Sequence, residues 1–304
     1  MTQGTIRKTL GNVHVATDFT DGALAAGERA ARLPLTPGAA IELVHVLPED
    51  SGGEAAERVG SAAKARLEGV KQEVVRDLRA LGNEDHSVFV SIKHGKPFVE
   101  IARNAHHGRA ELLVIGRHGS RSFRDLFIGS TAERIIRKGD TSVLVVSHKP
   151  DGDYKRPLLA ADMSDSSRLA LELALCLAEP GLASLDVVSV VPPPGQPYLG
   201  EAALVLDLAQ QSLDEREQRV RAQLTEFVAK SGVNTPCNLI VRTGDPRQTI
   251  LEVAKERGSD LIALGTEGKS GITHALVGSV AEGVLRNASC DVLVARAPRP
   301  DFNL

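Results

Sequence analysis

The chain has 304 residues, a formal net charge of -3 and three cysteines. This length suits two domains of ordinary size, the charge provides no basic surface for nucleic acid, and the widely separated cysteines indicate neither a zinc site nor a disulfide framework. No apolar run approaches the ~20 residues of a membrane span. We therefore expect a cytoplasmic protein with neither nucleic acid nor membrane as a partner.

In the first half, short apolar runs alternate with amphipathic segments. Strands are predicted over 12–17, 40–46, 87–93, 111–116 and 142–147. Helices are predicted between them, over 21–33, 54–81, 97–106 and 129–138. Short apolar runs that do not alternate with polar residues are typical of a parallel sheet covered on both faces.

The second half repeats this order. Strands are predicted over 157–161, 185–190, 237–242, 260–265 and 291–295, and helices over 165–178, 201–231, 246–257 and 278–287. The two halves match at an offset of 144 residues for the first two strands and 149 residues for the later elements. We therefore expect a duplication, with one domain over 1–150 and the other over 151–304.

Each half carries the same glycine pattern after its fourth predicted strand. The pattern is G-x2-G-x9-G followed by a helix, and its members are Gly116, Gly119, Gly129, Ser130 and Thr131 in the first half and Gly265, Gly268, Gly278, Ser279 and Val280 in the second. Glycines allow a sharp turn and close approach to a ligand, and the free N–H groups at a helix N-terminus suit phosphate. The repeated spacing predicts two phosphate-binding turns, with ordinary turn chemistry as the alternative.

Two other phosphate-binding motifs do not fit. A P-loop ending at Lys269 would need a glycine at position 263, which is Ala263. A dinucleotide-binding glycine motif would follow the first strand, where the two halves instead have Asp18 and Asp162. Thr20 and Ser164, two residues further on, are interpreted as N-caps of the next helix. Helix capping or a turn role is also the alternative for both aspartates.

Together, a strand ending in aspartate, a G-x-P before a helix (Gly95 to Pro97 and Gly244 to Pro246) and the spaced glycines resemble the ATP-binding branch of the universal stress protein family. The resemblance covers essentially the whole chain. It implies an α/β fold of two tandem flavodoxin-like domains, each a five-stranded parallel sheet of order 3-2-1-4-5 with helices on both faces. It also implies that Asp18 and Asp162 lie by the adenine and ribose, and Val46 and Val190 against the adenine.

The expected function is an ATP-binding, regulatory stress-response module with one potential adenine-nucleotide site per domain, and Mg²⁺ arriving with the polyphosphate. One alternative is a slow ATPase, although no Glu, His or Arg that could serve hydrolysis clearly repeats in both halves. The other is a nucleotide-free dimerisation scaffold. We also expect the final strands, over 142–147 and 291–295, to pair in an intrachain pseudo-dimer that covers two apolar edges. Association of two chains into a homodimer is left open.

Overall fold

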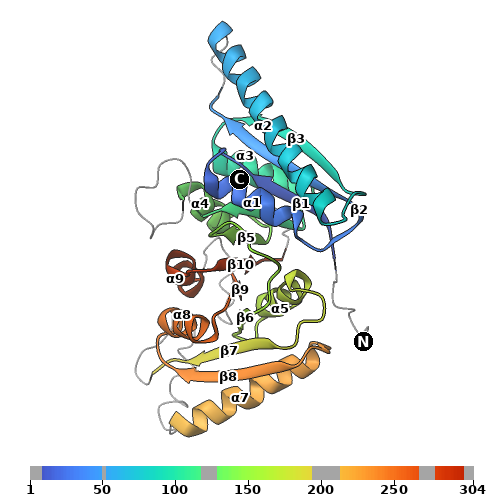
Figure 1. Ribbon diagram of the computed structural model, residues 1–304. Coiled ribbons are helices and arrows are strands. Elements are labelled where there is room, and N and C mark those ends of the chain that lie inside the picture. Colours follow the sequence, from blue (N-terminus) through green and yellow to red (C-terminus); the bar gives the residue numbers. More distant parts are fainter. Residues whose placement is uncertain (1–8, 50–52, 118–128, 194–212, 267–277, 298–304) are drawn as a thin grey trace. The chain divides into compact units, whose positions relative to one another are not determined.

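The computed structural model describes residues 9–49, 53–117, 129–193, 213–266 and 278–297 (Figure 1). These residues fall into two compact units, the N-terminal unit (residues 9–153) and the C-terminal unit (residues 154–296). Domain limits at residue 150 stay a prediction. No helix in the described ranges is long and apolar enough to cross a bilayer.

The N-terminal unit is a parallel five-stranded sheet with helices on both faces. Its strands are β1 (Leu10–Ala16), β2 (Leu35–Leu47), β3 (Ser87–His94), β4 (Leu112–Gly116) and β5 (Val143–Val146). Its helices are α1 (Asp21–Ala31), α2 (Glu54–Ala80), α3 (Pro97–His107) and α4 (Ser130–Lys138). The strand order is β3-β2-β1-β4-β5, and every neighbouring pair is parallel. The predicted order 3-2-1-4-5 is confirmed.

The C-terminal unit repeats this architecture. Its strands are β6 (Pro157–Ala160), β7 (Leu185–Val191), β8 (Cys237–Thr243), β9 (Leu261–Gly265) and β10 (Asp291–Ala295). Its helices are α5 (Asp165–Leu177), α7 (Leu213–Lys230), α8 (Pro246–Arg257) and α9 (Ser279–Asn287). The order β8-β7-β6-β9-β10 again corresponds to 3-2-1-4-5 within the unit. Residues 201–212 of the helix predicted over 201–231 lie outside the described residues.

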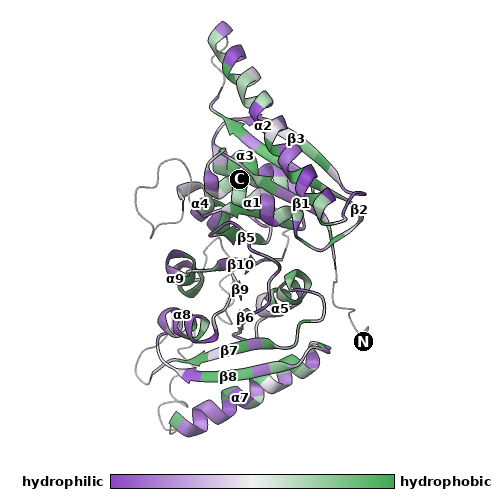
Figure 2. Cartoon of the chain, viewed as in Figure 1, coloured by the Kyte–Doolittle hydropathy of each residue, from purple (hydrophilic) through white to green (hydrophobic). Residues whose placement is uncertain are grey.

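The core explains why the apolar runs become central strands. Val15 on β1, Leu43 on β2 and Val114 on β4 are fully buried, and each such side chain stabilises the fold by about 1.5–3 kcal/mol. Helix α1 contacts α2, and α3 contacts α4, so the two pairs cover opposite faces, as right-handed crossovers require. Figure 2 shows α7 as a mostly hydrophilic helix, since few of its residues face the sheet.

Strand β2 differs from its prediction because it begins at Leu35, five residues earlier than the predicted start at 40. The early part contains Pro37 and Gly38, which are typical turn residues, so the pattern indicated a loop. The structure accommodates them by a register shift: Leu10 pairs with Leu35, but Asn12 pairs with Ala40. A local irregularity thus lengthens the strand without disturbing its buried part.

Candidate functional site

The carboxyl ends of the first and fourth strands lie side by side in each unit. Ala16 at the end of β1 pairs with Ile115 on β4, and Ala160 at the end of β6 pairs with Leu264 on β9. The strand order reverses at this point, and ligands of open parallel sheets bind in the crevice beyond it. The structure therefore brings Asp18 and Gly116 to one edge of one sheet, and Asp162 and Gly265 to the equivalent edge of the other.

The two predicted adenine contacts lie on the second strand of each sheet. Val46 is half-buried near the end of β2 and pairs with Lys93 on β3. Val190 is half-buried near the end of β7 and pairs with Arg242 on β8. Both valines are thus near the same edge as the aspartates, one strand further from the glycine turn. Gly119 and Gly268 lie outside the described residues.

The turn after the first strand is built around its aspartate. Asp18 Oδ1 accepts hydrogen bonds from the Thr20 backbone N–H at 3.1 Å and the Thr20 hydroxyl at 2.5 Å. The Thr20 hydroxyl in turn accepts from the Ala23 N–H and caps α1. Ser164 caps α5 through the Ser167 N–H in the same way. The N-cap interpretation of Thr20 and Ser164 is confirmed, and each aspartate also orients its cap.

Each turn contains a non-glycine residue in the left-handed region. Phe19 has φ 65° and Met163 has φ 60°, a conformation that costs on the order of 1–3 kcal/mol for such residues. Both follow the aspartate directly. The same strained turn therefore positions the aspartate in both units, and strain of this kind concentrates at binding sites.

Gly116 and Gly265 have a packing role that the sequence analysis missed. A Cβ at Gly116 would lie 2.8 Å from the Ala23 nitrogen and still closer to the backbone of Gly22, at the start of α1. A Cβ at Gly265 would lie 2.9 Å from the Ser166 backbone carbon, at the start of α5. Only glycine lets the end of the fourth strand approach the first helix so closely.

Gly129 and Gly278 have backbone angles that suit any amino acid. The φ and ψ angles are -57° and 140° at Gly129, and -55° and 142° at Gly278. A Cβ at Gly278 would meet only the Thr266 carbonyl oxygen, at an ordinary 3.5 Å. The Gly129 N–H donates to the Arg117 carbonyl at 2.9 Å, and the Gly278 N–H to the Thr266 carbonyl at 3.2 Å. Each glycine is therefore fixed beside the end of the fourth strand.

The helices that begin at these glycines lack a side-chain cap. The N-caps of α1, α5 and α8 accept backbone hydrogen bonds through their side chains. Those of α2, α3, α4 and α9 do not, and Gly129 and Gly278 have no side chain to offer. Within the described ranges, the next three N–H groups of each helix (Ser130 to Ala132 and Ser279 to Ala281) find no acceptor. An anion would satisfy these donors and the positive end of the helix dipole.

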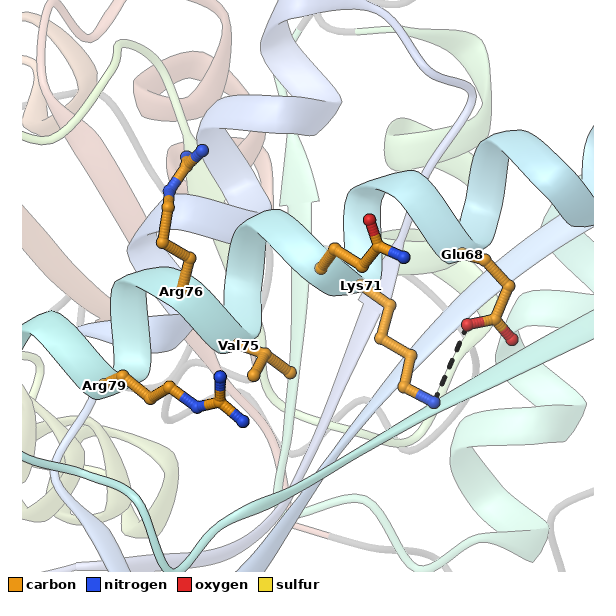
Figure 3. Close-up of a pocket in the computed structure, with 6 residues that line it drawn as sticks. Glu68, Lys71, Val75, Arg76 and Arg79 are labelled. Atoms are coloured by element: carbon orange, nitrogen blue, oxygen red, sulfur yellow. Dashed lines mark ion pairs between the residues drawn. The ribbon is translucent and has the colours of Figure 1, made fainter.

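A separate shallow hollow runs along the outer side of α2 (Figure 3). Its lining residues all come from this one helix, and they are Glu68, Lys71, Gln72, Val75, Arg76 and Arg79. Lys71 is paired with Glu68 at 3.7 Å. A single helix forms the hollow, and it shares no residue with the strand ends described above.

Comparison with known proteins gives the same family for both units. Residues 9–147 and 153–296 match the model of the universal stress protein family. Universal stress protein MJ0531 of Methanocaldococcus jannaschii is 33% identical over 151 residues, which cover 49% of this chain and 85% of that protein. Universal stress protein Sll1388 of Synechocystis sp. is 28% identical over 153 residues, covering 47% of this chain and 98% of that protein.

A solved structure matches the fold over almost the full length. A universal stress protein from Archaeoglobus fulgidus superposes with a TM-score of 0.65 at 19% identity, covering 94% of this chain and 98% of that chain. A second, from Pseudomonas aeruginosa, gives a TM-score of 0.62 at 19% identity, covering 96% of this chain and 94% of that chain. At 19% identity, this structural similarity shows the fold alone.

Proposed function

Because this chain belongs to the universal stress protein family, with family matches over residues 9–147 and 153–296, we propose that it binds adenine nucleotides, with one ATP site in each unit. Nucleotide loading would then regulate its role in the stress response. Binding of an intracellular nucleotide fits the expected cytoplasmic location.

The observation that carries this proposal is the pair of uncapped helix N-termini beside the fourth strands. Three consecutive N–H groups begin each of α4 and α9 without an acceptor among the described residues. Ser130 and Ser279 are exposed at these positions and add a hydroxyl donor, while Thr131 and Val280 supply the next N–H. We assign the polyphosphate to this position, with Gly119 and Gly268 completing the turns and Mg²⁺ arriving on the phosphate oxygens.

The nucleoside would extend from the phosphates across the first strand toward the second. On the other side of the fourth strand each unit has only its final strand, whereas the first and second strands provide two further strand ends. Neighbouring strands lie ~4.8 Å apart, so a nucleotide anchored at α4 reaches the ends of β1 and β2. Asp18 and Asp162 would accept from ribose hydroxyls, and Val46 and Val190 would contact the base.

The test is calorimetric titration of the full chain with ATP in the presence of Mg²⁺. We expect binding in the wild type, and we expect Gly129→Val and Gly278→Val each to weaken the site in its own unit, because the added side chain covers the N–H groups. Gly69→Val on α2, where an added Cβ meets no atom within 4 Å, is the matched control. Wild-type protein that takes up no ATP at millimolar concentration would favour the scaffold alternative.

The ATPase alternative requires a separate measurement. Phosphate release above background by the wild type, lost in the Gly129→Val or Gly278→Val variant, would show that the site also hydrolyses its ligand. We favour a binding role, because the residues assigned here hold phosphate and nucleoside without a general base placed for hydrolysis.

A further inference from the structure

Helices α3 and α4 of the N-terminal unit contact each other, and they carry a group of side chains that the proposed nucleotide site does not use. This basic cluster consists of Phe98 on α3, Arg134 and Lys138 on α4, and Lys96 at the N-cap of α3. The three cations are exposed, and Phe98 is half-buried. The cluster is therefore positive charge on the surface of the chain.

The Phe98 ring holds two of these cations in place. The Arg134 guanidinium carbon lies 5.3 Å from the ring centroid, and Lys138 Nζ lies 5.5 Å from it. A cation over an aromatic face is attracted by the negative face of the ring. Both long side chains are thus ordered before any partner arrives, which lowers the entropy that binding costs.

The two cations on this ring also repel each other. Arg134 and Lys138 are four residues apart on one helix, an arrangement in which like charges are destabilising. The neighbouring Arg137 has a carboxylate partner, with its Nη2 3.2 Å from Glu133 Oε1. Arg134, Lys138 and Lys96 form no ion pair with any residue that the structure describes. A bound carboxylate would relieve the repulsion.

The equivalent surface of the C-terminal unit is neutralised. The residues 149 positions after Lys96, Phe98, Arg134 and Lys138 are Asp245, Arg247, Gly283 and Asn287. Arg247 Nη2 pairs with Asp245 Oδ2 at 2.8 Å. The Arg247 side chain also covers Gly283, where an added Cβ would lie 2.7 Å from it. The positive surface thus belongs to one unit and is not a feature of the repeated fold.

The spacing and number of the cations indicate the partner. Four residues of helix place Arg134 and Lys138 about 6 Å apart along α4, and alternate side chains of an extended peptide lie about 6.6 Å apart on one side. Two alternate carboxylates of such a peptide can therefore meet both cations. Nucleic acid is less suited, because its binding commonly uses about 6–10 phosphate contacts and the chain has a net charge of -3.

We propose that the basic cluster is a docking surface for an acidic segment of a partner protein. Carboxylates of that segment pair with Arg134 and Lys138, Lys96 adds a third positive charge, and Phe98 positions the first two. The proposal goes beyond nucleotide binding and does not depend on it.

Fluorescence anisotropy of the full chain without nucleotide tests the proposal, with a labelled peptide of alternating Glu and Ser as the probe. We expect saturable binding that weakens as salt rises from about 0.1 M to about 1 M, because the Debye length falls from about 10 Å to about 3 Å. The double variant Arg134→Gln and Lys138→Gln should bind about tenfold more weakly, since each exposed ion pair contributes up to about fivefold.

The matched control removes the same amount of charge from the other unit. Lys255→Gln and Arg257→Gln change two exposed residues of α8 and should leave peptide binding unchanged. Phe98→Leu, which keeps an apolar side chain but loses the aromatic ring, should weaken binding about two- to fivefold. Equal weakening in the control and in the Arg134 and Lys138 variant would overturn the proposal, because total charge would then explain binding.

Transfer of the cluster gives a test by gain of binding. Asp245→Asn, Arg247→Phe, Gly283→Arg and Asn287→Lys together should create a second peptide site, in the C-terminal unit. One peptide per chain in this variant, with an unchanged circular dichroism spectrum, would contradict the proposal. Tighter binding of a single-stranded oligonucleotide than of the peptide, or self-association of the chain that is lost with Arg134 and Lys138, would assign the cluster to another partner and overturn it.

Discussion

At the scale of single residues, the first and third glycines of the repeated pattern have different roles. Gly116 lies against the backbone of α1, and Gly265 lies against that of α5. Gly278 is free of a comparable contact with described residues, and Gly129 and Gly278 begin the helices of the proposed phosphate site. Substitutions at the first glycine therefore probe packing, and substitutions at the third probe the ligand.

We predict that Gly116→Ala lowers the free energy of unfolding by about 1–3 kcal/mol, the usual cost of overpacking, because the new methyl group meets backbone that cannot move aside. Gly278→Ala should change stability far less, since its Cβ fits. Urea unfolding of both variants without nucleotide makes the comparison. Equal losses of stability in the two variants would show that the close approach of α1 does not require glycine at position 116.

The sequence predicted which glycines matter but not why. A missing Cβ suits a tight packing contact and a ligand contact equally, and only the fold reveals that α1 passes Gly116. The left-handed Phe19 and Met163 carried no signal, because neither is a residue that favours that conformation. Ser167 also went unnoticed, since its partner Asp162 lies five residues away across a strand-to-helix turn.

At the scale of packed elements, the N-terminal unit contains a buried polar contact between β1, β2 and α3. His14 on β1 is 1% exposed, its Nε2 lies 3.3 Å from Glu42 on β2, and its Nδ1 lies 3.0 Å from the Asn104 amide nitrogen on α3. The equivalent of His14 is Leu158, and that of Asn104 is Val253. One unit therefore has a titratable group where its repeat has an apolar core.

Burial lowers the pKa of His14 below its ordinary 6.5; nearby Glu42 opposes this shift, and Lys93 on β3 adds to it. The folded state thus binds fewer protons than the unfolded state, so this contribution to stability is complete above the unfolded pKa and is lost as pH falls through the folded pKa. We predict that the melting temperature of the N-terminal unit falls between about pH 7 and about pH 5.

The double variant His14→Leu and Asn104→Val, which introduces the residues of the repeat, should show a smaller fall over the same pH range. Differential scanning calorimetry of wild type and variant measures the difference. An unchanged pH dependence in the variant would assign the effect to other groups.

The helices and strands were largely predictable, because short continuous apolar runs indicate buried strands and amphipathic helices have a clear periodicity of apolar residues. The main departure was the start of β2, where Pro37 and Gly38 follow Leu35 in a strand that a local bulge makes longer. The contact of His14 with Asn104 could not be predicted, since it joins residues 90 positions apart.

At the scale of the whole molecule, the pairing of the final strands stays a prediction. Within its own unit β5 has β4 as a neighbour on one side only, and β10 has only β9. We expect the backbone amides of β5 and β10 to exchange with deuterium as slowly as those of the central strands β1 and β6. Strands β3 and β8, at the other edge of each sheet, are the internal control. Fast exchange at alternate residues of β5 and β10 would contradict pairing.

The hydrogen bonds that fix Gly129 to Arg117 and Gly278 to Thr266 have a consequence for protein engineering. Each brings the two ends of an eleven-residue segment, 118–128 or 267–277, together at a backbone contact of 2.9 Å or 3.2 Å. Closing a longer loop between fixed ends costs only about 0.6 kcal/mol for each doubling of its length. A reporter peptide inserted after Gly119 or Gly268 would leave both glycines and the helix start in place. Positions 120–128 and 269–277 are therefore suitable for building a genetically encoded nucleotide sensor.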